Sequence, residues 1–186
     1  MWKRFCKWLL YKKMKWRAEV TEEMPEKFII CLAPHTSNWD FLIGELYNVA
    51  HGLKSNFLMK KEWFFWPLGG MFRRMGGIPV YRQKHSSLTD TLAETARQTA
   101  HFRLCVTPEG TRHKVEEWKR GFYIIAQKAQ LPILLFGLDY ERRLILCTKT
   151  IIPSGDIDAD MRTIKSYFKD FKGKKPENFC ATLNDQ

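Results

Sequence analysis

The chain has 186 residues, of which 45% are hydrophobic and 27% are charged, so it is long enough for one compact domain and too hydrophobic to be intrinsically disordered. Its longest stretches without a charged residue or histidine span ten residues, which excludes a membrane-spanning helix of about 18 or more apolar residues; the apolar stretch near the start is also too short for a secretory signal. The five cysteines are widely spaced without a Cys-x-x-Cys pair, which is typical of reduced thiols in a cytoplasmic protein rather than of disulfides or a zinc site.

The formal net charge of +11 indicates an anionic partner, such as nucleic acid, anionic lipid or a phosphorylated ligand. Seven basic residues and no acidic residue lie within residues 1–17, so most of the excess charge is at the start of the chain. A helix there would place one apolar and aromatic face opposite its basic residues, which suits the interface of a lipid bilayer. The expected members of that face are Trp2, Phe5, Cys6, Leu9 and Trp16.

We therefore interpret residues 1–24 as a basic, aromatic, amphipathic segment that docks on an anionic membrane surface. One alternative is a solvated helix whose aromatic face packs on its own domain. A nucleic-acid-binding patch is another alternative, but no motif of a known nucleic-acid-binding module follows, so we expect no nucleic-acid partner. The expected location is cytoplasmic and peripheral, on the inner face of the cell membrane.

From residue 25 onward, apolar runs rich in β-branched residues alternate with helical patterns, and nearly continuous apolar runs are typical of strands covered on both faces. The expected strands are Phe28–Ala33, Asn56–Met59, Ile78–Tyr81, Leu104–Thr107, Ile133–Leu138 and Leu144–Cys147. The expected helices lie near Asn38–Ala50, Ser87–His101 and Trp118–Ala129, and a last helix carries Ile157, Met161, Ile164, Phe168 and Phe171. The sequence predicts a single α/β domain over residues 25–186, with a mostly parallel or mixed sheet flanked by helices and preceded by the basic amphipathic helix.

A first group of polar residues follows the first expected strand, at the edge where open α/β sheets bind their ligands. If the next helix begins near Ser37, Asp40 lies in its first turn and reaches back toward the ring of His35. A carboxylate on one imidazole nitrogen orients the ring, and the other nitrogen can then accept a proton from a hydroxyl group. Ser37-x-x-Asp40 also matches a helix capping box, in which Asp40 binds only backbone N–H groups.

A second group, residues 107–112, follows another apolar strand. Pro108 and Gly110 bracket Glu109 in a predicted turn, and the planar guanidinium of Arg112 suits a phosphate. Glu109 either accepts hydrogen bonds from a polyol hydroxyl or pairs with an arginine to hold the turn. Arg82, which closes a strand preceded by two glycines, is either a third anion-binding residue or an ordinary surface cation.

These motifs, in this order, resemble those of the glycerophosphate acyltransferase superfamily, specifically of 1-acyl-glycerol-3-phosphate acyltransferase-like proteins. Four blocks carry the resemblance: the H-x-x-x-x-D dyad of His35–Asp40, the block Gly77–Arg82, the P-E-G-T-R block Pro108–Arg112, and Leu131-Pro132-Ile133. The chain departs from the family pattern at Leu135, where a second proline usually ends the fourth block, and at Pro34, where many relatives have asparagine.

The resemblance implies transfer of a fatty acyl group from acyl-CoA or acyl carrier protein to the hydroxyl of a lysophospholipid, foremost 1-acyl-glycerol-3-phosphate. It assigns a general base to His35 and its orienting carboxylate to Asp40. It places the acceptor on Lys60, Arg82, Glu109, Gly110, Thr111 and Arg112. The sequence contains no H-E-x-x-H motif and no clustered Cys/His pattern, so we expect no catalytic metal, and no cofactor besides the acyl donor. The alternatives are a lyso-aminolipid acceptor, or a non-catalytic basic module that binds anionic lipid or nucleic acid.

Overall fold

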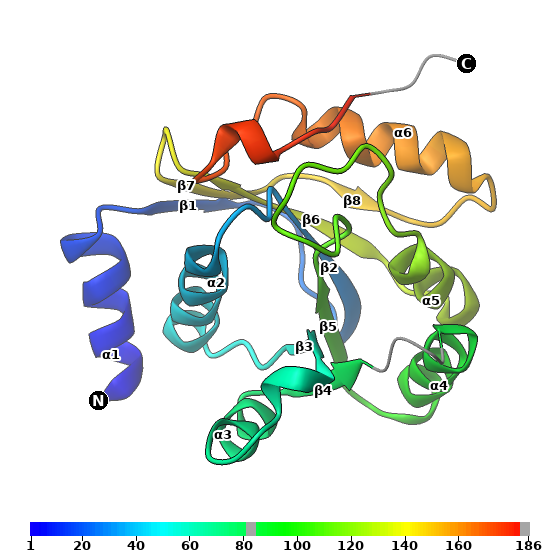
Figure 1. The fold of residues 1–186 in the computed structure, drawn as a ribbon, viewed down its shortest axis with the longest axis horizontal. Helices are drawn as coiled ribbons and strands as arrows, with labels where there is room; N and C mark the ends of the chain where they lie inside the picture. The colour runs from blue at the N-terminus through cyan, green and yellow to red at the C-terminus, as the bar shows by residue number, and fades with distance from the viewer. Residues whose placement is uncertain (81–84, 183–186) are drawn as a thin grey trace.

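The computed structural model describes residues 1–80 and 85–182, which form a central sheet with helices on both faces (Figure 1). The strands are β1 (Arg17–Val20), β2 (Lys27–Ala33), β3 (Asn56–Lys60), β4 (Gly77–Val80), β5 (Phe102–Val106), β6 (Ile133–Asp139), β7 (Leu144–Cys147) and β8 (Thr150–Ile151). The helices are α1 (Trp2–Lys7), α2 (Asn38–His51), α3 (Leu68–Arg74), α4 (His85–Gln98), α5 (Gly121–Ala129) and α6 (Ile157–Phe168). Short helical turns are η1 (Trp8–Lys13), η2 (Lys61–Trp63) and η3 (Pro176–Asn178).

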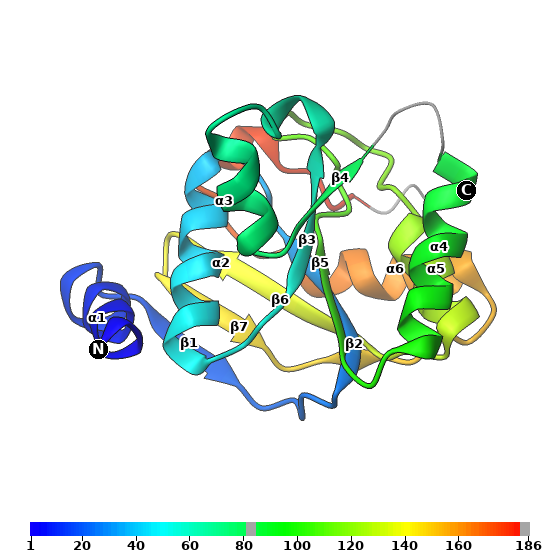
Figure 2. The ribbon, with the colours of Figure 1, turned by 90° about the horizontal axis from the view of Figure 1, so that it is seen from below.

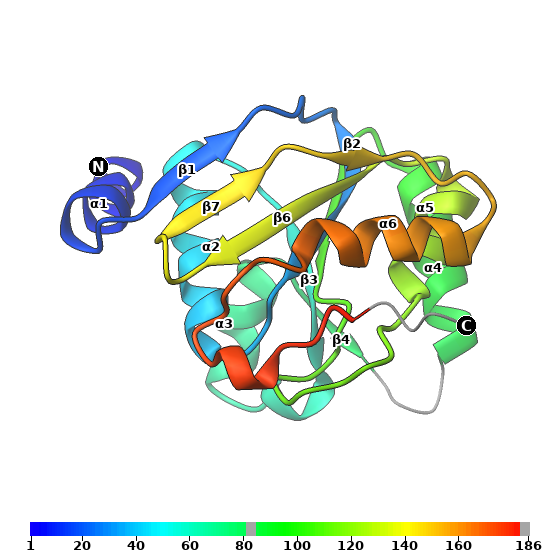
Figure 3. The same cartoon turned by 90° about the horizontal axis from the view of Figure 1, so that it is seen from above.

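The strand order is β1-β7-β6-β2-β5-β3-β4, with β8 paired to β6. Strands β6, β2, β5, β3 and β4 run parallel to one another, β7 and β8 run antiparallel to β6, and β1 runs parallel to β7 (Figure 3). The sheet is therefore mixed and mostly parallel, and the predicted fold class is confirmed. Its central strand is β2, which carries the first group of polar residues at its carboxyl end.

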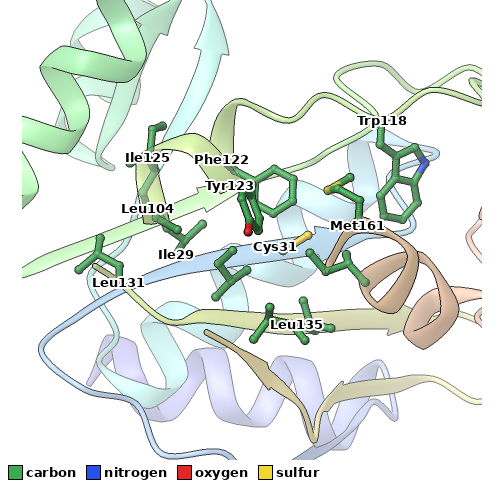
Figure 4. Close-up of a cluster of buried hydrophobic side chains, with 14 of the residues drawn as sticks. Ile29, Cys31, Leu104, Trp118, Phe122, Tyr123, Ile125, Leu131, Leu135 and Met161 are labelled. Carbon is green, nitrogen blue, oxygen red and sulfur yellow. The ribbon is translucent and has the colours of Figure 1, made fainter. Parts of the chain in front are cut away.

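The two faces of the sheet bury separate hydrophobic clusters, which explains the unbroken apolar run of β2. Ile29 and Cys31 point toward α4, α5 and α6 (Figure 4), whereas Phe28 and Ile30 point toward α2 and the N-terminal helix. Because successive side chains of a strand point to opposite faces, a strand covered on both faces needs an apolar residue at every position. Figure 2 shows α2 separated from α4 and α5 by the sheet.

Residues 1–24 do not form one continuous amphipathic segment. Helix α1 passes into the π-helical turns of η1, and the chain then enters β1, which pairs with β7. The buried side chains of this region are Cys6, Leu10 and Trp16, while Trp2, Phe5 and Trp8 are exposed. The predicted apolar face is therefore wrong, because the helical turns end at Lys13, before Trp16, and because Cys6 is buried while Trp2 and Phe5 are exposed.

Other differences concern short or weakly patterned elements. The sequence did not predict β1, β8 or α3, and the helix expected from Trp118 begins at Gly121. The exposed positions of β1 and the two glycines within α3 give neither element a hydrophobic pattern. The end of the strand expected over Ile78–Tyr81 lies outside the described residues.

Candidate active site

The candidate site lies at the carboxyl end of β2, where the chain leaves the sheet between two parallel neighbours. Ala33 of β2 lies opposite Gly137 of β6, and Cys31 lies opposite Val106 of β5. The segments that follow these three strands consequently emerge at the same edge of the sheet. This edge is where doubly covered α/β sheets bind their ligands.

The imidazole of His35 and the carboxylate of Asp40 lie next to each other, as predicted from their spacing. His35 Nδ1 is 3.2 Å from Asp40 Oδ2, within ion-pair distance, although their orientation does not meet hydrogen-bond geometry. The Asp40 side chain is completely buried, whereas the His35 side chain is 20% exposed. A fixed carboxylate thus lies behind a ring that remains partly accessible from outside.

Asp40 also forms the cap of helix α2. It therefore lies beside His35 and takes part in the capping box with Ser37 at the same time. Ser37 and Asp40 make a capping box at the start of α2. The backbone N–H groups of Thr36 and Ser37 each donate to Asp40 Oδ2 at 2.8 Å. The cap therefore fixes the same oxygen that faces the imidazole, and the local sequence that starts the helix also positions the carboxylate.

Glu109 connects the second motif to the first. The backbone N–H of His35 donates to Glu109 Oε1 at 2.8 Å, while Oε2 is buried and has no hydrogen-bond partner in the described part of the chain. Burial raises the pKa of the Glu109 carboxyl to about 7; hydrogen bonds from backbone N–H groups oppose the shift, and the charge of Asp40 adds to it. Gly110 adopts a positive φ of 65°, and its N–H donates to Thr107 O at 3.1 Å, so a glycine closes the turn that directs Glu109 inward.

The structure brings only some of the predicted site residues into direct contact. His35, Asp40 and Glu109 are linked by the contacts above. Arg112 is half-buried beyond the Glu109 turn, and Lys60 is exposed at the end of β3; within residues 1–80 and 85–182, no hydrogen bond or ion pair joins either side chain to the dyad. The remaining three predicted residues are Gly110, which forms the Glu109 turn, Thr111, whose hydroxyl accepts from the His113 N–H at 3.3 Å, and Arg82, which lies outside the described residues.

Two further segments contact the histidine loop and were missed from the sequence. Tyr140, directly after β6, donates its hydroxyl to Asp40 Oδ1 at 2.6 Å. Near the C-terminus, the Lys175 N–H donates to Thr36 Oγ1 at 3.1 Å, and the ammonium of Lys174 lies 4.3 Å from the ring centre of Trp39. One signal was available for Tyr140, since it follows a strand expected to lie in the same parallel sheet as β2.

No helix among the described residues is long and apolar enough to cross a membrane. Within the same residues, no group of three or more His, Cys, Asp or Glu side chains is arranged to hold a metal ion.

The fold and this edge define an α/β enzyme with a histidine–carboxylate pair beyond its central parallel strand. The chain belongs to the acyltransferase family: the family model described as Acyltransferase matches residues 15–137. The superfamily predicted from the four blocks is thereby confirmed, and the protein is an acyltransferase.

A solved structure shares the fold. The 1-acyl-sn-glycerophosphate (LPA) acyltransferase PlsC from Thermotoga maritima is similar with a TM-score of 0.54 and 19% sequence identity, over 83% of this chain and 68% of that chain. No curated protein matches the sequence. The family match ends at residue 137, so Tyr140 and the C-terminal segment lie beyond it.

Proposed function

We propose that this enzyme transfers a fatty acyl group from the thioester of acyl-CoA or acyl carrier protein to the hydroxyl of a lysophospholipid in phospholipid biosynthesis. The acceptor that we favour is 1-acyl-glycerol-3-phosphate, because Lys60, Arg82 and Arg112 are predicted to bind an anion and the similar solved enzyme is named for this substrate. The observation that carries the proposal is the imidazole of His35 beside the buried carboxylate of Asp40, in a loop whose backbone N–H at His35 donates to Glu109.

In the proposed reaction, Nε2 of His35 accepts the proton of the acceptor hydroxyl, and the oxygen of that hydroxyl attacks the carbonyl carbon of the thioester. Asp40 stabilises the imidazolium that forms, because its buried carboxylate lies beside Nδ1. The C–S bond then breaks, and the imidazolium returns the proton to the leaving thiolate. A new oxygen ester and a free thiol result, and general-base catalysis of this kind contributes about 100- to 10,000-fold.

Glu109 and the basic residues are assigned to the acceptor. The unpartnered Oε2 of Glu109 is assigned to the glycerol-phosphate part of the acceptor, because a buried polar atom without a partner is costly unless a ligand satisfies it. The only free hydroxyl of 1-acyl-glycerol-3-phosphate gives its proton to His35, so Glu109, whose pKa is raised to about 7, is assigned in its protonated form as a donor to an oxygen of the glycerol-phosphate. Arg112, Lys60 and Arg82 are assigned to the phosphate, for which a guanidinium provides two parallel N–H donors. Gly110 and Thr111 complete the same turn.

We expect Arg112→Ala to raise the KM for 1-acyl-glycerol-3-phosphate by about 10- to 100-fold, the usual cost of losing charge-assisted hydrogen bonds. Acyl transfer to a monoacylglycerol, which lacks the phosphate, should change little. Free thiol released from acyl-CoA measures both rates. Arg120→Ala is the matched control, since Arg120 is exposed and pairs with Asp158.

A panel of purified acceptors and both donor carriers tests the proposed substrate itself. Preference for a lyso-aminolipid, with no effect of Arg112→Ala on its use, would replace the phosphate-bearing acceptor. Absence of transfer from every thioester donor would contradict the proposed reaction.

We further propose that the exposed face formed by α1 and the start of η1 docks on an anionic membrane surface. Trp2, Phe5 and Trp8 are 68%, 45% and 52% exposed, and their rings form a continuous row with centroids 5.4 and 5.9 Å apart. All seven basic residues of the region are exposed; they are Lys3, Arg4, Lys7, Lys12, Lys13, Lys15 and Arg17. Exposed aromatic rings beside Lys and Arg are the composition of interfacial helices.

Replacing Trp2, Phe5 and Trp8 together by alanine should weaken binding to vesicles that contain anionic lipid by at least about tenfold, because interfacial binding scales with buried apolar area. Vesicle flotation measures the bound fraction. Ile152→Ala removes a comparably exposed apolar residue that directly follows β8, and it should leave binding unchanged. Equal binding of the triple variant and the wild type would refute docking through this face.

A further inference from the structure

The carboxylate of the dyad is held by a tyrosine from another strand. The Tyr140 hydroxyl donates to Asp40 Oδ1 at 2.6 Å, across 100 residues of sequence. The contact arises because β6 and β2 are parallel neighbours with Ala33 opposite Gly137, so both chains leave the sheet side by side. Tyr140 lies just outside the segment that matches the acyltransferase family.

The Tyr140 ring is itself held in place. The buried ring of Trp16 packs edge-on against it, with centroids 5.0 Å apart. The Tyr140 N–H donates to Lys172 O at 2.8 Å, which ties this position to the C-terminal segment. Burial and then the charge of Asp40 raise the pKa of the Tyr140 hydroxyl well above its ordinary value, so it remains a proton donor at neutral pH.

The two oxygens of Asp40 have different partners, and this division determines its orientation. Oδ2 accepts from the N–H groups of Thr36 and Ser37 and faces the imidazole, whereas Oδ1 accepts from Tyr140. The other contact of Oδ1 is the long one from Ser37 Oγ, at 3.4 Å. Without the tyrosine hydroxyl, the buried Oδ1 would keep only the long hydrogen bond from Ser37 Oγ among the described residues. The Asp40 carboxylate would then rotate to shorten that hydrogen bond.

We propose that Tyr140 is a positioning residue of this acyltransferase, whose hydroxyl fixes the rotation of the Asp40 carboxylate and so keeps Oδ2 against His35. Trp16 supports this role by holding the tyrosine ring. The inference rests on the proposed roles of His35 and Asp40 in catalysis, and it adds a residue that acts through Asp40 without touching the substrate.

Tyr140→Phe removes the hydroxyl and keeps the ring. We expect kcat to fall by about 10- to 100-fold, as is usual when a partner that orients a reacting group is lost, while the KM for the acceptor stays within about threefold. In the Asp40→Asn background, the same substitution should change kcat by less than about twofold, because the group that Tyr140 positions is already impaired. A tyrosine that merely supports folding would lower activity by the same factor in both backgrounds.

Tyr123→Phe is the matched control. Tyr123 is buried and, like Tyr140, donates its hydroxyl to an aspartate, Asp160 Oδ2 at 2.8 Å, but it lies on the opposite face of the sheet. Its loss should lower the denaturation midpoint and leave kcat within about twofold of wild type.

The outcomes separate the two proposals. Wild-type kcat in Tyr140→Phe, with Asp40→Asn strongly impaired, overturns the role of Tyr140 and leaves the dyad standing. Full activity of Asp40→Asn overturns both. An equal loss of kcat in Tyr123→Phe and Tyr140→Phe would also overturn the positioning role, because lower stability alone would then explain the loss of activity.

Discussion

Replacement of His35 by alanine is expected to lower the rate of acyl transfer by about 100- to 10,000-fold while the protein remains folded. The loss is large because the proposed mechanism has no other base beside the acceptor hydroxyl, and a base in place contributes a factor of this size. Folding should persist, because the His35 side chain is partly exposed and its backbone N–H, which binds Glu109, survives the substitution. Thiol release under saturating donor measures the rate, and circular dichroism checks the fold.

Two companion variants sharpen this test. Asp40→Asn keeps the shape of the side chain but removes the charge beside the imidazole, and its loss of kcat should approach that of His35→Ala. His101→Ala removes an exposed histidine that pairs with Glu26, so its activity should equal that of wild type. Retained turnover in His35→Ala would end the proposal that this imidazole is the general base.

Glu109→Gln should stabilise the protein increasingly as the pH rises from about 4.5 to above 7. Burial raises the pKa of the folded-state carboxyl to about 7 from the ordinary 4.5. Below pH 4.5 the Glu109 carboxyl is neutral in both the folded and the unfolded state, so it does not lower the free energy of unfolding. Between the two values the unfolded state ionises first, so the free energy of unfolding falls as pH rises, by on the order of 3 kcal/mol at about 1.4 kcal/mol per pKa unit.

Urea unfolding of both proteins at a series of pH values measures this difference. The variant retains an oxygen that can accept from the His35 N–H, so the comparison isolates the charge. Glu117→Gln is the control for the substitution itself, because Glu117 is exposed in the same loop. A constant difference between Glu109→Gln and wild type across this range would contradict the raised pKa.

The parts of the fold that were predictable are those where burial leaves a local pattern. Strands β2 and β6 are covered on both faces, so their sequences are nearly all apolar, and α6 shows its buried stripe at steps of three and four. Strand β1 has no such pattern because three of its four side chains are exposed. Its place in the sheet comes from pairing with β7, an interaction between backbones that no side-chain sequence records.

The candidate site was predictable where its contacts are local. The spacing from His35 to Asp40 predicts their approach, and Ser37 supplies the helix start that makes it possible. Contacts between segments distant in sequence were not predictable, such as the bond from the His35 N–H to Glu109 or that from Tyr140 to Asp40. These depend on the order of strands in the sheet, which hydrophobic periodicity does not specify.

The pairing of β1 with β7 determines how the N-terminal region can be manipulated in the laboratory. A truncation that removes residues 1–24 would delete an edge strand together with Trp16, and it would leave the backbone groups of β7 open to other chains. Such a protein would tend to aggregate, and aggregation would be mistaken for loss of lipid affinity or of turnover. Surface substitutions on α1 and at the start of η1 avoid that confusion, because Trp2, Phe5 and Trp8 are exposed and lie outside the sheet.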